Sequence, residues 1–156
     1  MKDPRQAALN RLMRHCARVE TCTADARRKL DRYDLSEEEK EGIIGRLKAD
    51  GFIDDGRYAR AFAGEKVRIG RQGRLKIRAA LKQRGIAAEQ IDAALQSIDP
   101  EEYGEAIDAA LAPRLQGLQL PLSWQERGRL LQYAAGRGFE YDETTAYLSE
   151  RGIDIE

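Results

Sequence analysis

The chain has 156 residues, of which 42% are hydrophobic and 35% charged, and its formal net charge at neutral pH is zero. This length is enough for one compact domain or a short array of small modules. Two cysteines exclude a scaffold built on disulfides and indicate a reducing compartment. No apolar run approaches the roughly 18 residues of a membrane span, and the start lacks a signal peptide's apolar core. We therefore expect a cytoplasmic protein with no membrane association.

The spacing of apolar residues is helical along the whole chain. An amphipathic helix is indicated by the three-and-four spacing of Leu9, Leu12, Met13, Cys16 and Val19, and no long alternation of apolar and polar residues indicates strands. The pattern predicts an all-α protein with about nine helices. The predicted spans are 5–19, 23–33, 36–50, 54–69, 72–84, 87–97, 99–116, 123–137 and 142–150.

Capping sequences mark the predicted helix boundaries. Ser36 and Ser123 each stand three residues before a glutamate, which is the pattern of a capping box. Asp54 and Asp99 stand directly before helices and predict N-caps. A glycine followed by an apolar residue predicts a left-handed turn at the end of four helices. These glycines are Gly51, Gly85, Gly138 and Gly152.

The predicted helices group into threes. An Ile-Asp-x-x-x-Tyr junction begins at Ile53 and recurs at Ile98. We therefore predict three tandem three-helix repeats of about 45–50 residues. Their bounds are 1–53, 54–98 and 99–156. Because such small units can hardly bury a core alone, we expect them to stack into an elongated, curved array.

The charges are distributed unevenly. Residues 57–84 carry ten basic groups and one acidic group, whereas residues 85–156 carry five basic and fourteen acidic groups. Four basic residues, three within the helix predicted over 72–84 and one directly before it, fall within an arc of about 80° at helical spacing. They are Arg71, Arg74, Arg78 and Lys82. Like charges at i,i+4 cost about 0.2–0.5 kcal/mol per pair, so this face indicates a contact outside the fold, with phosphate or an acidic protein surface.

The alternative is that these basic residues pair inside the fold. The acidic stretches 34–55 and 99–108 could supply their partners. That arrangement would make the basic helix an ordinary solvated face with intramolecular ion pairs.

The residues that could hold a metal ion do not form a convincing site. His15 is the only histidine, and Cys16 and Cys22 are too far apart in sequence for the usual zinc pair. Asp54 and Asp55 are better explained by capping the helix that follows them. We therefore predict no metal site.

No pattern of an enzyme is present. Gly70 and Gly73 lack the Gly-Lys-Ser/Thr that holds a nucleotide and its magnesium, so they predict a turn between helices. No nucleophile and base stand together in a recognisable motif. We predict that the chain is not an enzyme and has no cofactor.

Two segments resemble the signature of the RecX family. They are FIDDGRYARAF from Phe52 to Phe62 and GRLKIRAALKQRGI from Gly73 to Ile86. Arg137-Gly138-Phe139 resembles the terminal Arg-Gly-Phe element of the family, and the first repeat is a looser match. The resemblance covers the chain from about residue 7 to residue 150.

This resemblance implies a function. RecX proteins are all-helical arrays of three-helix repeats that bind the filament of the RecA recombinase on DNA. They inhibit its strand exchange and ATP hydrolysis and promote loss of the filament. The resemblance thus implies a regulator of RecA whose partners are the RecA filament and single-stranded DNA, and we expect it to be a monomer.

The basic face and the resemblance together nominate contact residues for RecA or DNA. The candidates are Lys66, Arg68, Arg71, Arg74, Lys76, Arg78, Lys82, Arg84, Arg57, Arg60 and Arg137.

Two other functions are compatible with the sequence. The chain could be a general nucleic-acid-binding module, because three-helix units can resemble helix-turn-helix domains; its zero net charge is an argument against that role. It could also be a helical scaffold for another protein, with no role on DNA.

Overall fold

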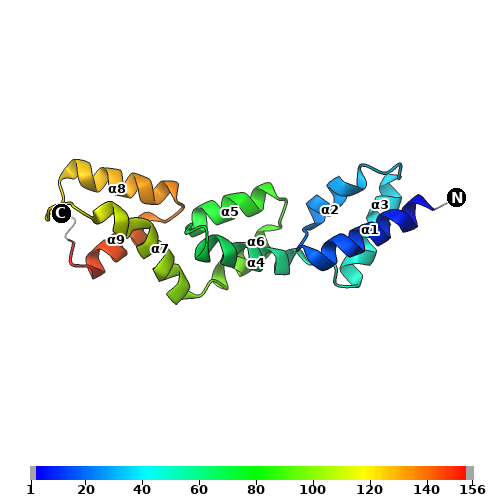
Figure 1. Ribbon diagram of the computed structural model, residues 1–156, viewed down its shortest axis with the longest axis horizontal. Helices are drawn as coiled ribbons and strands as arrows, with labels where there is room; N and C mark the ends of the chain where they lie inside the picture. The colour runs from blue at the N-terminus through cyan, green and yellow to red at the C-terminus, as the bar shows by residue number, and fades with distance from the viewer. Residues whose placement is uncertain (1–2, 154–156) are drawn as a thin grey trace. The chain divides into compact units, whose positions relative to one another are not determined.

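The computed structural model describes residues 3–153, and all regular secondary structure in that range is helical (Figure 1). The helices are α1 (Pro4–Arg18), α2 (Thr23–Leu30), α3 (Glu37–Ala49), α4 (Asp55–Arg68), α5 (Arg74–Gln83), α6 (Ala88–Gln96), α7 (Pro100–Leu115), α8 (Trp124–Gly136) and α9 (Tyr141–Glu150). The predicted all-α class is confirmed, as are the nine predicted helices within residues 3–153. No helix within these residues is long and apolar enough to cross a membrane.

The predicted helix ends agree with the structure to within three residues. The largest difference is in α2, which ends at Leu30 rather than at residue 33 because the chain turns there. The backbone N–H of Tyr33 donates to the carbonyl of Leu30 (3.0 Å) in this turn. The outermost residues of the first and third predicted repeats, 1–2 and 154–156, lie outside the described residues.

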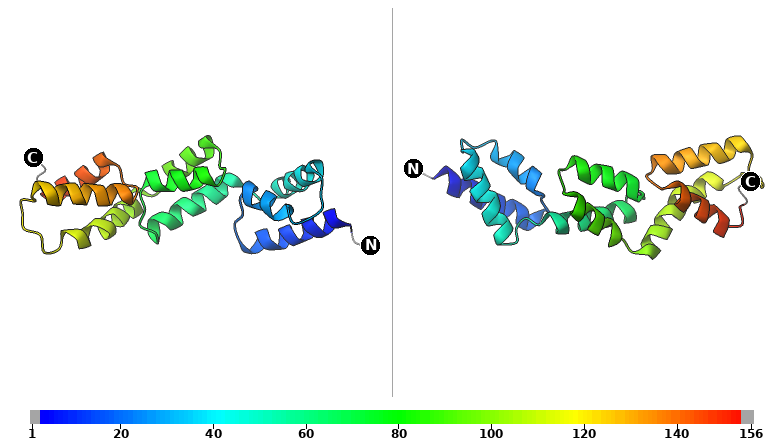
Figure 2. Two further views of the ribbon diagram at one scale, coloured as in Figure 1. Left: turned by 90° about the horizontal axis from the view of Figure 1, so that it is seen from above. Right: turned by 180° about the vertical axis from the view of Figure 1, so that it is seen from behind.

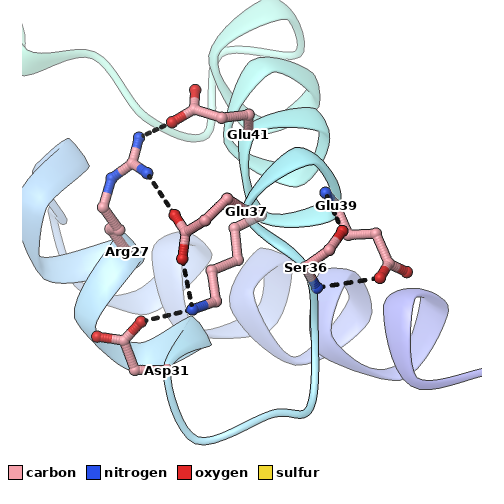
Figure 3. Close-up of polar contacts among 7 residues, drawn as sticks. Arg27, Asp31, Ser36, Glu37, Glu39 and Glu41 are labelled. Atoms are coloured by element: carbon pink, nitrogen blue, oxygen red, sulfur yellow. Dashed lines mark hydrogen bonds and ion pairs between the residues drawn. The ribbon is translucent and has the colours of Figure 1, made fainter.

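The predicted caps are present. The Ser36 hydroxyl accepts from the Glu39 N–H (3.1 Å), and the Glu39 carboxylate accepts from the Ser36 N–H (3.0 Å; Figure 3). Ser123 forms the same box at α8, and the carboxylates of Asp54 and Asp99 cap α4 and α7. The four glycines predicted to end helices all have positive φ. The boundaries of these helices are therefore set by local sequence.

The chain divides into two compact units. The first contains the residues up to Ala59 together with Leu81–Asp92, and the second contains Arg60–Ala80 together with the residues from Ala93 onward. Helices α4, α5 and α6 thus contribute to both units. These two units are defined by how compactly the chain packs, which is a different criterion from sequence repeats. The three repeats with boundaries near 53 and 98 stay a prediction from the amino-acid sequence.

The core of the first unit lies among α1, α2 and α3. Helix α3 packs on both α1 and α2, and it contributes Ile43, Ile44 and Leu47 to the core. Opposite them are Leu12 of α1 and Leu30 of α2, both buried. Of the apolar stripe predicted for the first helix, Leu9, Leu12 and Cys16 are buried and Met13 is partly buried. The prediction is wrong for Val19, which follows the end of α1 and is 54% exposed.

Ion pairs link α2 to the acidic start of α3. Arg27 of α2 pairs with Glu41 and lies 3.9 Å from Glu37, and Lys40 pairs with Asp31 (2.9 Å; Figure 3). The three carboxylates are 59–78% exposed, although the Lys40 side chain is only 12% exposed. Solvent around the carboxylates weakens these pairs, so they contribute little to stability. Their consequence is that the charge of Arg27 is already neutralised within the fold.

Asp55 caps a helix other than its own. Its carboxylate accepts a hydrogen bond from the backbone N–H of Thr23, the first residue of α2 (2.8 Å). The residue before α2, Cys22, provides no side-chain cap. The prediction that both aspartates cap the helix after them is thus confirmed for Asp54, which caps α4, and wrong for Asp55, which caps α2.

Replacing Asp55 by alanine should lower the free energy of unfolding by about 1 kcal/mol, because an N-terminal N–H of α2 loses its acceptor. Asp55→Asn keeps an acceptor oxygen and should lose less. Urea unfolding followed by circular dichroism measures both, and equal losses in the two variants would contradict the capping role.

The core of the second unit includes α7, α8 and α9. These helices pack on one another in pairs, and Figure 2 shows them side by side from two further directions. Their buried residues include Tyr103 and Leu111 of α7, Leu130 of α8 and Leu148 of α9. Phe139 in the turn between α8 and α9 is almost completely buried.

Candidate protein and nucleic-acid interface

The predicted contact residues differ in exposure. The exposed ones are Arg60, Arg68, Arg71, Lys76, Arg78 and Lys82, and the partly buried ones are Arg57, Lys66, Arg74, Arg84 and Arg137. Arg57, Lys82 and Arg84 belong to the first compact unit, and the other eight belong to the second.

Arg74 belongs to a polar network in the second unit. Its guanidinium donates to the Glu143 carboxylate of α9 (2.9 Å), and its carbon lies 4.0 Å from the centre of the Tyr103 ring. The Tyr103 hydroxyl accepts from the Arg74 backbone N–H (3.1 Å) and donates to Glu143 (3.0 Å). The side chain of Arg74 is 32% exposed and that of Glu143 is 21% exposed. The sequence proposed Arg74 as a contact outside the fold, and the structure gives it partners inside.

The Tyr103 hydroxyl remains a donor in this network. Burial raises its pKa well above the usual range, and the neighbouring Glu143 carboxylate acts in the same direction. A carboxylate accepts hydrogen bonds and disfavours a second negative charge beside it. The hydroxyl is therefore protonated at neutral pH, as its bond to Glu143 requires.

Arg137 joins two turns of the second unit. Its guanidinium donates to the backbone carbonyls of Gly70 and Arg71, the latter at 2.9 Å. Its own carbonyl accepts from the N–H of Gly73 (2.8 Å), and the Gly138 carbonyl accepts from the N–H of Leu75 (3.0 Å). The turn predicted at Gly70 and Gly73 is confirmed, and we call this set of contacts the Arg137 clasp. The clasp occupies the Arg137 side chain within the fold.

Two further candidates form ion pairs within their own unit. Arg57 pairs with Glu20 (2.9 Å), and Arg68 lies 3.5 Å from Glu102. Glu102 belongs to the acidic stretch 99–108, which was the alternative source of partners. All four side chains are at least one-third exposed, so solvent weakens both attractions.

Several candidates keep their charge open to solvent. Within residues 3–153, no ion pair engages Arg60, Arg71, Lys76 or Lys82. The prediction that Arg71 shares a helix face with Arg74, Arg78 and Lys82 is wrong, because α5 begins at Arg74. Arg71 lies in the turn before α5 and holds a positive φ of 51°. Its backbone is fixed through the Arg137 clasp, while its side chain stays exposed.

Two exposed apolar residues near this turn were not predicted. Ile69, which follows α4, is 76% exposed, and Leu75 at the start of α5 is 48% exposed. Leu75 stands beside Arg74 in sequence but is off the buried face marked by Ile77 and Leu81. The position of Leu75 outside the buried face of the helix is the sequence signal that could have predicted its exposure. Arginine with exposed apolar side chains is typical of protein-binding surfaces.

No cluster of histidine, cysteine and carboxylate suited to a metal ion occurs among the described residues. Cys16 and Cys22 are buried and unpaired. Burial raises the pKa of both thiols. They therefore have the character of core residues rather than of reactive thiolates.

These elements define an all-helical protein of the kind built from small three-helix units. A family model described as the second three-helix domain of RecX matches residues 54–95, which lie within the predicted middle repeat. Two crystal structures share the fold. One, of a regulatory protein RecX, has a TM-score of 0.82 and 23% identity over 94% of this chain and 72% of that chain. The other, RecX from Lactobacillus salivarius, has a TM-score of 0.82 and 20% identity over 96% and 97%.

Curated relatives give the same assignment. The regulatory protein RecX of Serratia proteamaculans is 33% identical over 66% of this chain and 60% of its own length. That of Halorhodospira halophila is 29% identical over 97% and 92%, and that of Streptococcus gordonii is 28% identical over 94% and 55%. The chain thus spans little more than half of the Streptococcus and Serratia relatives but nearly all of the Halorhodospira one. The chain is therefore similar to regulatory proteins RecX along nearly its whole length, and its residues 54–95 match the second three-helix domain of that family.

Proposed function

We propose that the chain is a regulator, mainly negative, of the RecA recombinase. It binds the filament of RecA on single-stranded DNA and inhibits ATP hydrolysis and strand exchange. The observation that carries this proposal is the match of residues 54–95 to the second three-helix domain of RecX, together with the similarity of the chain to proteins called regulatory protein RecX. The proposal places the chain in the cytoplasm with RecA and assigns it neither a catalytic role nor a cofactor.

The contact surface in this proposal is the exposed part of residues 60–82. Arg71 and Lys76 of the second unit are exposed and form no ion pair within residues 3–153. The apolar side chains of Ile69 and Leu75 are exposed in the same unit. A mixed basic and apolar surface supports contact with a protein as well as with phosphate.

Reversing both charges in Arg71→Glu/Lys76→Glu should raise the concentration needed to inhibit RecA by about tenfold, which corresponds to about 1.4 kcal/mol. The measurement is the single-strand-dependent ATP hydrolysis of RecA from the same organism, titrated with each variant at constant DNA. Arg74 stays unchanged because its reversal would disturb the network with Glu143.

A matched control is Lys48→Glu/Arg129→Glu, which changes the net charge equally at two other exposed positions. It should inhibit as the natural chain does. Equal loss in both double variants would show that overall charge governs inhibition, and unchanged inhibition in the first would remove this surface from the proposal.

The same titration separates the alternative functions. Inhibition well below one molecule per RecA protomer supports action on the filament. Inhibition only when the protein saturates the DNA, relieved by extra DNA, indicates a general nucleic-acid-binding module. Absence of inhibition at every ratio indicates a scaffold for another partner.

A further inference from the structure

A basic cavity of about 370 Å³ opens beside α1 and α2 in the first unit. It is lined by Arg11, His15 and Arg18 of α1, by Lys29 of α2, and by Arg32 and Tyr33 in the turn after α2. The apolar side chain of Leu12, which belongs to the core, completes the lining. None of the described residues that line this cavity carries a carboxylate.

The positive charges of the cavity lack partners in the fold. Within residues 3–153, no ion pair engages Arg11, Arg18, Lys29 or Arg32. Arg27, only two residues before Lys29, does have carboxylate partners on α3. Helix α2 therefore directs Arg27 to the fold and Lys29 to the cavity. Like charges gathered without counter-charges favour an anionic ligand.

An adjoining cavity shares His15, Lys29 and Arg32 but contains acidic groups. Glu20, Asp25 and Arg28 also line it, and Asp25 pairs with Arg28 (2.9 Å). The acidic groups make this second space a poorer site for an anion. The carboxylate-free cavity around Arg11, His15 and Arg18 is the stronger candidate.

We propose that the cavity of Arg11, His15, Arg18, Lys29, Arg32 and Tyr33 binds a phosphate and its nucleotide within a strand of single-stranded nucleic acid. Arginine forks match phosphate oxygens, and an aromatic ring offers a surface on which a base can stack. The volume lies in the range that accommodates a small-molecule-sized group such as one nucleotide. An acidic side chain of a protein would fill much less of it. This site is separate in sequence from residues 57–84, and its test does not depend on RecA.

His15 makes the proposed binding sensitive to pH. Partial burial lowers its pKa, and the positive charges of Lys29 and Arg18 lower it further, whereas Asp25 acts in the opposite direction. Arg11 and Arg32 face it in the cavity, and Glu20 and Arg28 face it in the adjoining one. A bound phosphate places negative charge beside the imidazole and so raises its pKa. Binding then takes up a proton, and affinity should be higher at pH 6 than at pH 8.

The sole histidine gives a direct measurement in the full chain. The NMR signal of the His15 ring is followed through a pH titration, with and without a short oligothymidylate. We expect its pKa to rise by about one unit, a tenfold change in proton affinity, when the oligonucleotide binds. Replacement of His15 by glutamine should abolish the difference in affinity between pH 6 and pH 8. An unchanged His15 titration at saturating oligonucleotide would overturn the proposal.

Two single variants on the same helix test the location. Arg18→Glu reverses a charge inside the cavity and should weaken oligothymidylate binding at least fivefold. Arg14→Glu makes the same change at an exposed position of α1 outside the lining and should change it less than twofold. Equal weakening by the two variants would overturn the site, provided that circular dichroism shows both to be folded.

Two further probes test the class of ligand. If an oligoglutamate peptide shifts the His15 signal as strongly as the oligonucleotide does, the cavity binds an acidic polypeptide and the proposal is wrong. If inorganic phosphate does so at equal phosphate concentration, the assignment to a nucleic-acid strand is wrong. Each of these outcomes leaves the proposed regulation of RecA intact, because no RecA is present.

Discussion

Replacing Gly73 by alanine should lower the free energy of unfolding by about 3 kcal/mol. A Cβ at this position would lie 2.3 Å from the carbonyl carbon and oxygen of Gly138 and 2.5 Å from the nitrogen of Phe139. These are backbone atoms, so the clash can be relieved only by moving one turn away from the other. That movement would lengthen the bond from the Gly73 N–H to the Arg137 carbonyl and so open the Arg137 clasp.

A control for this variant is Gly136→Ala. Gly136 ends α8, close to the same turn, and a Cβ there would meet nothing within 4 Å. Because alanine is a better helix former than glycine, this variant should be unchanged or more stable by up to about 1 kcal/mol. Chemical unfolding followed by circular dichroism measures both. A loss below about 1 kcal/mol for Gly73→Ala would mean that the clasp yields readily and does not hold the second unit together.

The helices and their ends could be predicted because their signals are local. A serine or aspartate at an N-cap contacts an N–H two or three residues away, as Ser36 contacts Glu39. The left-handed turn at Gly138 likewise depends on a few neighbouring residues. Where the cap comes from a residue distant in sequence, the sequence did not predict it. Asp55 lies 32 residues after Thr23, whose backbone N–H at the start of α2 donates to it. No residue near Thr23 in sequence predicts this hydrogen bond.

The basic face was harder to interpret for the same reason. Spacing placed Arg74 correctly on the helix of 74–83 but could not show that Glu143, 69 residues later, would pair with it. Nor could it show that the Arg137 side chain, 67 residues from Gly70, would be used to join two turns. A basic residue that has no acidic residue near it in sequence can therefore still pair with a distant acidic residue in the fold. Lys76 is exposed and no ion pair engages it within residues 3–153, whereas Arg74 pairs with Glu143.

Both acidic segments supply carboxylates that pair with arginines inside the fold. Glu102 of the stretch 99–108 lies beside Arg68, and Glu37 and Glu41 lie beside Arg27. Pairing within the fold thus engages some of the chain's arginines, including Arg68 of the candidate interface. The arginines that it leaves, among them Arg18 in the first unit and Arg71 in the second, are those on which the two proposals depend.

Replacing Glu143 by alanine should lower the free energy of unfolding by about 2 kcal/mol, since the partly buried carboxylate accepts charge-assisted hydrogen bonds. It accepts from the Arg74 guanidinium (2.9 Å), the Tyr103 hydroxyl (3.0 Å) and the Glu140 N–H (2.8 Å). Removing it leaves these three donors without their acceptor at the junction of α5, α7 and α9. Urea unfolding measures the loss.

A double-mutant cycle with Arg74→Met and Glu143→Gln isolates the charge pair. Glutamine retains an acceptor oxygen for Tyr103 and Glu140, and methionine retains much of the apolar stem of Arg74. We expect a coupling free energy of about 1 kcal/mol, as for residues that share a hydrogen-bond network. Additive losses would show that Arg74 and Glu143 act independently. In that case the Arg74 charge would be available to an external partner, and Arg74 would rejoin the candidate interface.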